Sequence, residues 1–151
     1  MRFRAFPFTK LLVAFLAGLF GILIFLPELN AMDFPREGHT DIPNGVAAPF
    51  AGRWWIGFPE GEGMINGEPV VSCSSAVELV PQEHEKLLYR SSRGVKVLFE
   101  LLEFSGRTTW LPESGESIIA VWVNEGEFFA YSVDLTTGKA RWADPTVYRR
   151  C

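Results

Sequence analysis

Residues 95–103, which read VKVLFELLE, decide the fold class of this chain. Apolar side chains stand at every second position of the stretch: Val95, Val97, Phe99 and Leu101. A period of two is typical of a β-strand with one buried face. Residues 87–90 form a second apolar stretch, and turn residues at 91–94 separate the two. This arrangement predicts an antiparallel hairpin.

Similar short stretches, separated by turn residues, continue outward in both directions. Residues 124–126 (Asn-Glu-Gly) mark a second hairpin, and alternate residues of its second limb share one face: Phe129, Tyr131, Val133 and Leu135. Further strands are expected at 54–56, 71–79, 106–111 and 118–123, with a last one from 140–142 to 146–149. Only residues 81–88 predict a short helix, with proline in its first turn.

The strands number about eight, so the fold class is mostly β. Eight short strands joined by hairpins can close on themselves and leave no open edge. We therefore expect a small antiparallel up-and-down β-barrel that follows an N-terminal apolar helix. A β-sandwich is the alternative, because strand count and alternation do not separate the two architectures.

The first 31 residues differ in composition from the rest. Residues 11–26 form an unbroken apolar or glycine run, LLVAFLAGLFGILIFL, and three basic residues precede it. A basic start followed by an apolar run is typical of an export signal. The run is also close to the length that spans a bilayer, so a signal peptide cleaved after Ala31 and an inner-membrane anchor both remain open. Either way, Met32 onward is expected in the periplasm or outside the cell.

The remaining chain divides once more. Residues 32–49 hold three prolines and two glycines, and their apolar residues share no period. We expect a flexible linker there and a barrel domain over residues 50–151.

The net charge of the exported part narrows the classes of partner that it is expected to bind. The chain has 14 basic and 18 acidic side chains, and residues 1–31 hold three of the basic ones and one acid. The exported part therefore has 11 against 17, a formal net charge of −6. An acidic domain lacks the basic surface that phosphate backbones require, so no nucleic-acid partner is expected. Membrane contact is expected only through the N-terminal segment.

The two cysteines, Cys73 and Cys151, both lie in the exported part. Thiols outside the cytoplasm are usually oxidised, so a Cys73–Cys151 disulfide is the first interpretation. Two separate thiols are the alternative.

The sequence offers little for catalysis. His39 lies in the linker, and His84 stands among charged residues of a predicted turn. The serines have no glycine-elbow context, and the pairs Glu60/Glu62 and Glu83/Glu85 could in principle suit acid–base work, but the fold usually brings glycosidase carboxylates together, so such spacing does not indicate a site. No histidine–cysteine cluster has the spacing of a metal site. We expect no enzyme, no catalytic residue, no metal and no cofactor.

Aromatic residues are the more distinctive feature. Five tryptophans stand in the domain, and most rings are expected to fill its core. Trp55 and Phe128 are each neighbours of a residue placed inward, so both are expected to point outward and form a binding surface. That expectation depends on strand register, since a slip of one residue reverses it.

Residues 50–54 (FAGRW) resemble the first strand of calycin barrels, the group that includes lipocalins and carries a G-x-W motif there. The resemblance implies that Gly52 and Trp54 close the barrel with a basic residue near its end, here Arg149 or Arg150. A guanidinium would then lie over the indole. The domain is as short as the small calycin barrels of exported bacterial protease inhibitors, which insert an N-terminal segment into a protease. Residues 32–49 would have that role here.

A second resemblance, to periplasmic lysozyme inhibitors, rests on a small β domain with a cysteine at its end. From these observations we expect a non-enzymatic envelope binding module, lipocalin-like, which holds a small apolar ligand or a protein partner. An inhibitor of an exported hydrolase (protease or lysozyme) is the alternative, and a structural envelope protein is the third. An empty interior would favour the small ligand. A filled core with an exposed apolar patch would favour the protein.

Overall fold

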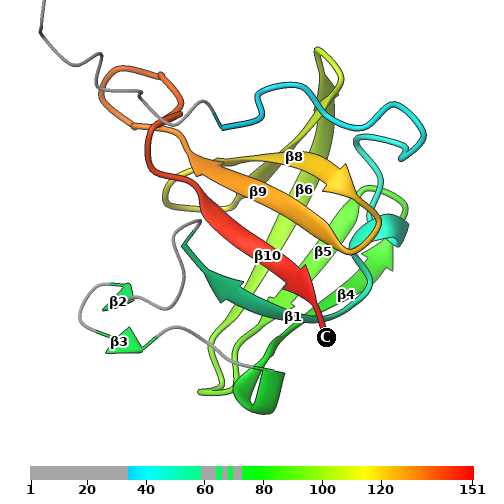
Figure 1. Ribbon diagram of the computed structural model, residues 1–151, viewed down its shortest axis with the longest axis vertical. Coiled ribbons are helices and arrows are strands. Elements are labelled where there is room, and N and C mark those ends of the chain that lie inside the picture. The colour runs from blue at the N-terminus through cyan, green and yellow to red at the C-terminus, as the bar shows by residue number, and fades with distance from the viewer. Residues whose placement is uncertain (1–33, 59–63, 66–67, 70–72) are drawn as a thin grey trace, which may run out of the picture. The chain divides into compact units, whose positions relative to one another are not determined.

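The computed structural model describes residues 34–58, 64–65, 68–69 and 73–151. Within this part of the chain, eight antiparallel strands close into a barrel in the order β1-β10-β9-β8-β7-β6-β5-β4 (Figure 1). This confirms the up-and-down barrel over the sandwich. The barrel strands are β1 (Gly52–Gly57), β4 (Val77–Glu83), β5 (Lys86–Arg90), β6 (Lys96–Phe104), β7 (Arg107–Pro112), β8 (Ile118–Asn124), β9 (Glu127–Ser132) and β10 (Thr146–Arg150).

Four shorter elements of the described residues do not belong to the barrel sheet. β2 (Met64–Ile65) pairs with β3 (Glu68–Pro69) in a separate sheet. Two 3-10 turns precede strands, η2 (Ala48–Phe50) before β1 and η3 (Cys73–Ser75) before β4. The apolar helix expected near the N-terminus lies outside the described residues.

β5 and β6 form the predicted hairpin. Leu87 pairs with Phe99 and Tyr89 with Val97, so these side chains face the barrel interior together. Phe99 and Leu101 are buried, whereas Leu98 and Leu102 on the other face are exposed. The period of two in the sequence therefore gave the correct inward face of β6 from Val97 to Leu101, whereas Val95 precedes the strand and is exposed.

Three local predictions were wrong. Residues 81–88 are not helical, because β4 continues through Pro81 into a tight turn and pairs with β5, with a register shift at Pro81 where a proline can be accommodated. The second strand does not begin at 71, since Cys73–Ser75 is a 3-10 turn and β4 begins at Val77. Residues 140–142 contribute only an isolated bridge from Ala140 to Val133.

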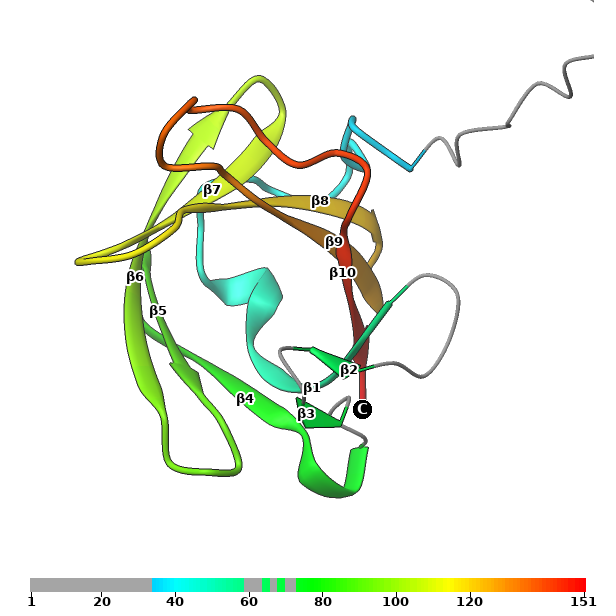
Figure 2. The ribbon, with the colours of Figure 1, turned by 90° about the vertical axis from the view of Figure 1, so that its left-hand side faces the viewer.

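The expectation of a flexible linker fails for residues 34–49, which pack on the barrel. Backbone amides of this segment donate to three different parts of the barrel: His39 to the Trp122 carbonyl on β8 (2.9 Å), Gly45 to Thr108 Oγ1 on β7 (3.0 Å) and Ala47 to the His84 carbonyl in the β4–β5 turn (2.8 Å). The segment thereby crosses the end of the barrel where the β4–β5, β6–β7 and β8–β9 turns lie, as the cyan trace in Figure 2 shows. We call this the closed end.

Periodicity could not reveal this role, because the segment crosses a barrel end instead of following one face. Its apolar residues enter the core singly: Ile42, Ala47 and Phe50 are all buried. Gly45 has φ +74°, and a Cβ built on it would stand 2.8 Å from the Glu103 amide nitrogen. Only glycine fits this crossing without strain.

Aromatic rings fill the interior beside the closed end. Phe50 has its ring centroid 4.6 Å from Trp122, 5.1 Å from Trp110 and 5.2 Å from Phe128. Trp54 lies 4.9 Å from Phe128, with its indole N–H donating to the Phe50 carbonyl at 2.8 Å. These aromatic rings thus form part of the core, as expected.

Candidate functional site

The two ends of the domain meet at Trp54 and Arg150. Trp54 is fully buried, and the guanidinium carbon of Arg150 lies 4.2 Å from the centre of its ring. The same guanidinium donates to the carbonyls of Pro49 (2.9 Å), Ala51 (2.7 Å) and Glu125 (3.1 Å). Gly52 has φ +133°, and a Cβ on it would come within 2.9 Å of Arg150 Nη1. Arg150 therefore joins η2, β1, β10 and the β8–β9 turn at the closed end.

Trp55 and Arg149 form a second pair on the outer surface. The Arg149 guanidinium lies 5.2 Å from the Trp55 ring centre and donates through Nε to Glu127 at 2.6 Å. Trp55 is partly exposed, so it does face outward, with its ring folded over Gly57. These contacts form a stacked ring and cation on the outer surface of β1 and β10.

Phe128 does not belong to an outer surface. Its side chain is fully buried and stacks on Tyr148 with the ring centroids 4.5 Å apart. The prediction that it points outward was wrong, because the β8–β9 pairing shifts register between Trp122 and Asn124 and turns the even-numbered residues of β9 inward. Phe129 and Tyr131 consequently face outward.

The outward side chains of β9, Phe129 and Tyr131, are covered by other residues of the chain. Because they are covered, they are apolar like the residues of a core face. Phe34 packs on Phe129 with ring centroids 6.1 Å apart, and the Tyr131 hydroxyl donates to the Pro35 carbonyl at 2.5 Å. Trp142, from the β9–β10 loop, lies 4.7 Å from the Tyr131 ring. Tyr131 is fully buried as a result. The outer side of β8, β9 and β10 is thus covered by the chain's own residues.

Two guanidiniums hold Trp142 in this cover. Arg36 lies 5.7 Å and Arg107 5.2 Å from its ring centre. Arg107 also donates to the Arg36 carbonyl, which connects the N-terminal segment to β7. No sequence pattern placed these residues together, since they come from three distant segments.

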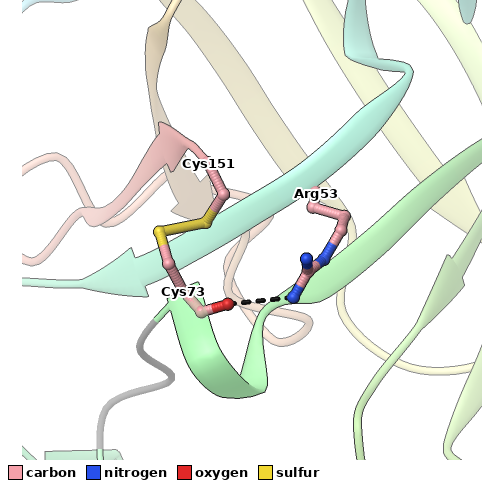
Figure 3. Close-up of a disulfide and its surroundings, with 3 residues drawn as sticks. All are labelled: Arg53, Cys73 and Cys151. Atoms are coloured by element: carbon pink, nitrogen blue, oxygen red, sulfur yellow. Dashed lines mark hydrogen bonds between the residues drawn. A yellow bond between two sulfur atoms is a disulfide. The ribbon is translucent and has the colours of Figure 1, made fainter.

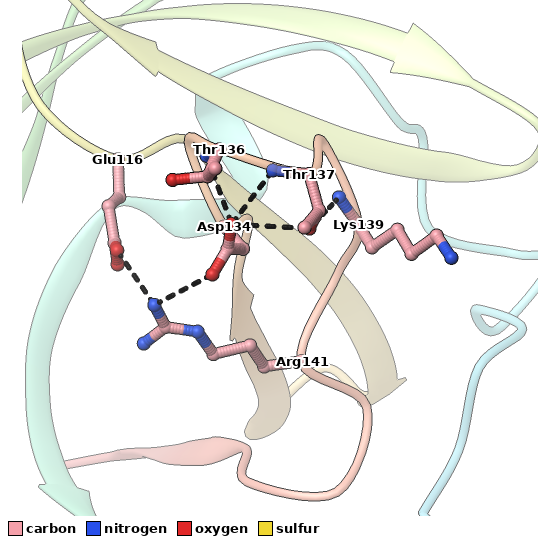
Figure 4. A network of polar contacts seen from close by, with 6 residues as sticks. All are labelled: Glu116, Asp134, Thr136, Thr137, Lys139 and Arg141. Carbon is pink, nitrogen blue, oxygen red and sulfur yellow. Dashed lines mark hydrogen bonds and ion pairs between the residues drawn. The ribbon is translucent and has the colours of Figure 1, made fainter.

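The loop that carries Trp142 is ordered by Asp134 (Figure 4). Asp134 Oδ1 accepts hydrogen bonds from the amides of Thr136 and Thr137, both at 2.9 Å. Bonds from the Thr137 amide and hydroxyl, and from the Thr136 amide, lower the pKa of the Asp134 carboxyl. Arg141 bridges Asp134 Oδ2 (3.5 Å) and Glu116 Oε1 (3.1 Å). These contacts stabilise the loop internally.

Cys73 and Cys151 form the predicted disulfide, with their Cα atoms 5.7 Å apart (Figure 3). Arg53 reinforces it from the neighbouring strand. Its Nη2 donates to the Cys73 carbonyl at 2.9 Å, and its own carbonyl accepts from the Cys151 amide at 2.9 Å. Both cysteines are exposed, so solvent and reductant reach the bond.

The described residues bring no catalytic pair together. His39 Nδ1 lies 3.9 Å from Asp41 Oδ2 with both side chains largely in solvent, and His84 is exposed in the β4–β5 turn. Glu83 is bound to Lys86, and the pair Glu60/Glu62 lies outside the described residues. In the part of the chain that the structure describes, no cluster of three metal-ligating side chains occurs, and no helix is long and apolar enough to cross a membrane.

One side of the barrel carries apolar residues on its outside. Val80, Leu88 and Leu98 pair in one row across β4, β5 and β6. Leu98 is 48% exposed and Leu102 44%, and Phe104 at the end of β6 is 71% exposed. With Leu111 on β7, we call these six residues the outer apolar face. In Figure 2, β6 and β5 form the left side of the barrel, and β4 continues from them along its lower side.

The comparisons with known proteins return nothing: no family model, no curated protein and no solved structure matches the chain.

Proposed function

We propose that this chain is a non-enzymatic, exported envelope module that binds a protein partner through the outer apolar face. The observation that carries the proposal is the contrast between the two sides of the barrel. Phe34, Pro35 and Trp142 cover the apolar row on β8–β10, whereas Leu98, Leu102 and Phe104 on β6 remain in solvent. Leu98 continues a row with Val80 and Leu88 across β4, β5 and β6, and an exposed apolar patch on a small soluble domain is typical of a protein interface.

The filled interior argues against the small-ligand version of the proposal. Ligand-carrying barrels need a cavity of a few hundred cubic ångströms. Here Phe50, Trp54, Trp110, Trp122 and Phe128 occupy the space beside the closed end in mutual ring contact. Binding on the outside needs no such space.

The contact between Arg150 and Trp54 at the closed end, which we call the clamp, supports membership of the calycin group. The G-x-W glycine and tryptophan, Gly52 and Trp54, meet the terminal Arg150 in the contact that the resemblance implies. Export is supported by the Cys73–Cys151 disulfide, because such bonds persist outside the cytoplasm.

The alternative of an inhibitor that inserts its N-terminal segment into a protease is less well supported. Insertion of residues 34–49 into a protease would require Ile42 and Ala47 to leave the barrel and would expose Phe50 beneath them. Burying one such side chain contributes about 1.5 to 3 kcal/mol, so the segment is held firmly. A partner of any kind, a hydrolase included, is therefore proposed to meet the outer apolar face.

Photo-crosslinking of the full chain in its own envelope tests the proposal. A photoreactive residue in place of Lys96, next to Leu98 on β6, should give one discrete adduct with another protein. The same residue in place of Lys139, on the β9–β10 loop, should not. Leu98→Ser with Leu102→Ser should abolish the Lys96 adduct and leave the melting temperature nearly unchanged, because both side chains are half exposed. An adduct that survives this double change, or equal adducts at both positions, would refute the proposed surface.

A further inference from the structure

A hollow of about 350 Å³ interrupts the outer apolar face. It lies over β5, β6 and β7 and is lined by Lys86, Leu98, Glu100, Leu111, Pro112 and Glu113. Glu100 pairs with Leu111 across β6 and β7, and the next pair along the same strands is Phe99 with Pro112. Glu113 follows the last residue of β7 directly. The lining of the hollow therefore includes two leucines and two glutamates.

The two carboxylates that line this hollow form no ion pair among the described residues. Glu100 and Glu113 are both exposed. Lys86 lines the same hollow and pairs with Glu100 across β5 and β6, but its ammonium lies 3.0 Å from Glu83. The lining of the hollow thus combines the apolar residues Leu98, Leu111 and Pro112 with two carboxylates that have no ion pair among the described residues.

We infer that this hollow receives a basic side chain, preferably arginine, from the protein partner. The inference rests on the proposed function and adds the chemistry of the contact. The aliphatic stem of an arginine would pack on Leu98, Leu111 and Pro112, as long basic side chains do on apolar surfaces. Because both carboxylates line the same hollow, one planar guanidinium with five donors can reach both Glu100 and Glu113. Lysine carries the same charge, but its ammonium lacks the planar, forked arrangement of donors that a guanidinium has.

Titration of the full chain, purified from the envelope, with N-acetylarginine amide tests the inference. N-acetylcitrulline amide, which has nearly the same shape without the charge, is the control ligand. The arginine compound should move the methyl NMR signals of Leu98 and Leu111 in a saturable way, and the citrulline compound should move them at least about fivefold more weakly, as expected for exposed ion pairs. Equal binding of the two ligands would overturn the assignment of a basic side chain.

Charge-removing variants locate the site. Glu100→Gln with Glu113→Gln should weaken arginine binding by about fivefold or more. Glu85→Gln with Glu125→Gln, which removes two exposed carboxylates elsewhere, should leave it unchanged. Arginine binding that is the same in both variants would overturn the inference. If the Lys96 crosslink is found and arginine binding is absent, the proposed protein-binding face is supported and only the inference of an arginine-binding hollow is refuted. Arginine binding without a crosslink refutes the proposed function and leaves a bare guanidinium site.

Discussion

The guanidinium of Arg150 lies over the ring of Trp54 at 4.2 Å, and so the penultimate residue of the chain caps the first strand of the barrel. Arg150→Ala removes this contact and three hydrogen bonds to carbonyls. We expect a loss of about 2 to 3 kcal/mol in the free energy of unfolding, measured by urea denaturation. Arg149→Ala is the matched control, because it removes an exposed stack and ion pair worth about 1 kcal/mol. If both variants lost the same free energy of unfolding, the Arg150 contacts would be no more stabilising than the exposed Arg149 pair, which would contradict this role of Arg150.

The disulfide is expected to stabilise the domain mainly through the unfolded chain. It joins residues 78 apart, for which the loop-closure model gives about 4 to 5 kcal/mol. Cys73→Ser with Cys151→Ser should lower the free energy of unfolding by that order and leave the barrel intact, since both residues are exposed. Urea denaturation of the variant beside the oxidised parent measures the difference. An unchanged midpoint would show that the bond contributes little.

Phe128 and Trp55 should respond very differently to truncation. Phe128→Ala leaves a cavity among Phe50, Trp54 and Tyr148 and should cost about 3 to 5 kcal/mol. Trp55→Ala removes a partly exposed ring and its contact with Arg149, at a cost of about 1 to 2 kcal/mol. Thermal or urea unfolding distinguishes the two. A mild effect at Phe128 would contradict its place in the core.

Gly45 is expected to be far less replaceable than Gly94. Both have positive φ, +74° and +84°, but a Cβ on Gly45 meets the Glu103 backbone at 2.8 Å while one on Gly94 meets nothing within 4 Å. Gly94→Ala should therefore cost about 1 kcal/mol and Gly45→Ala at least twice that. Gly45→Ala should also speed proteolysis within residues 34–50, which mass spectrometry of the fragments can locate. Equal costs would show that the segment does not cross the barrel end this way.

Stability should fall in alkali through Tyr148. Burial, with a smaller contribution from Tyr89, raises the pKa of the Tyr148 hydroxyl above its ordinary value of 10.0. Below pH 10 both the folded and the unfolded chain keep the proton, so the stabilisation is complete. Above it only the unfolded chain loses the proton, and the free energy of unfolding should drop by up to about 1.4 kcal/mol per pH unit. Tyr148→Phe should reduce this slope between pH 10 and 11.5, and an identical slope would contradict a buried phenol.

The sequence by itself predicted the approximate positions of most barrel strands, the inward face of β6 and the pairing of the two cysteines. Alternation at Val97, Phe99 and Leu101 is a local property, because neighbouring residues of a strand must point to opposite sides. With only two cysteines in the chain, Cys73 and Cys151 left a single pairing to consider.

Only the tertiary structure decided which aromatic face of β9 is inside and what covers the other. The alternation of Phe129 and Tyr131 is as regular as that of β6, yet the register shift at Trp122–Asn124 turns it outward, where Phe34 and Trp142 cover it. The outer apolar face of β6 lacks such a cover among the described residues, and no local pattern distinguishes the two cases. Burial depends on which distant segment packs against a strand, and a residue's immediate neighbours in the sequence do not record that.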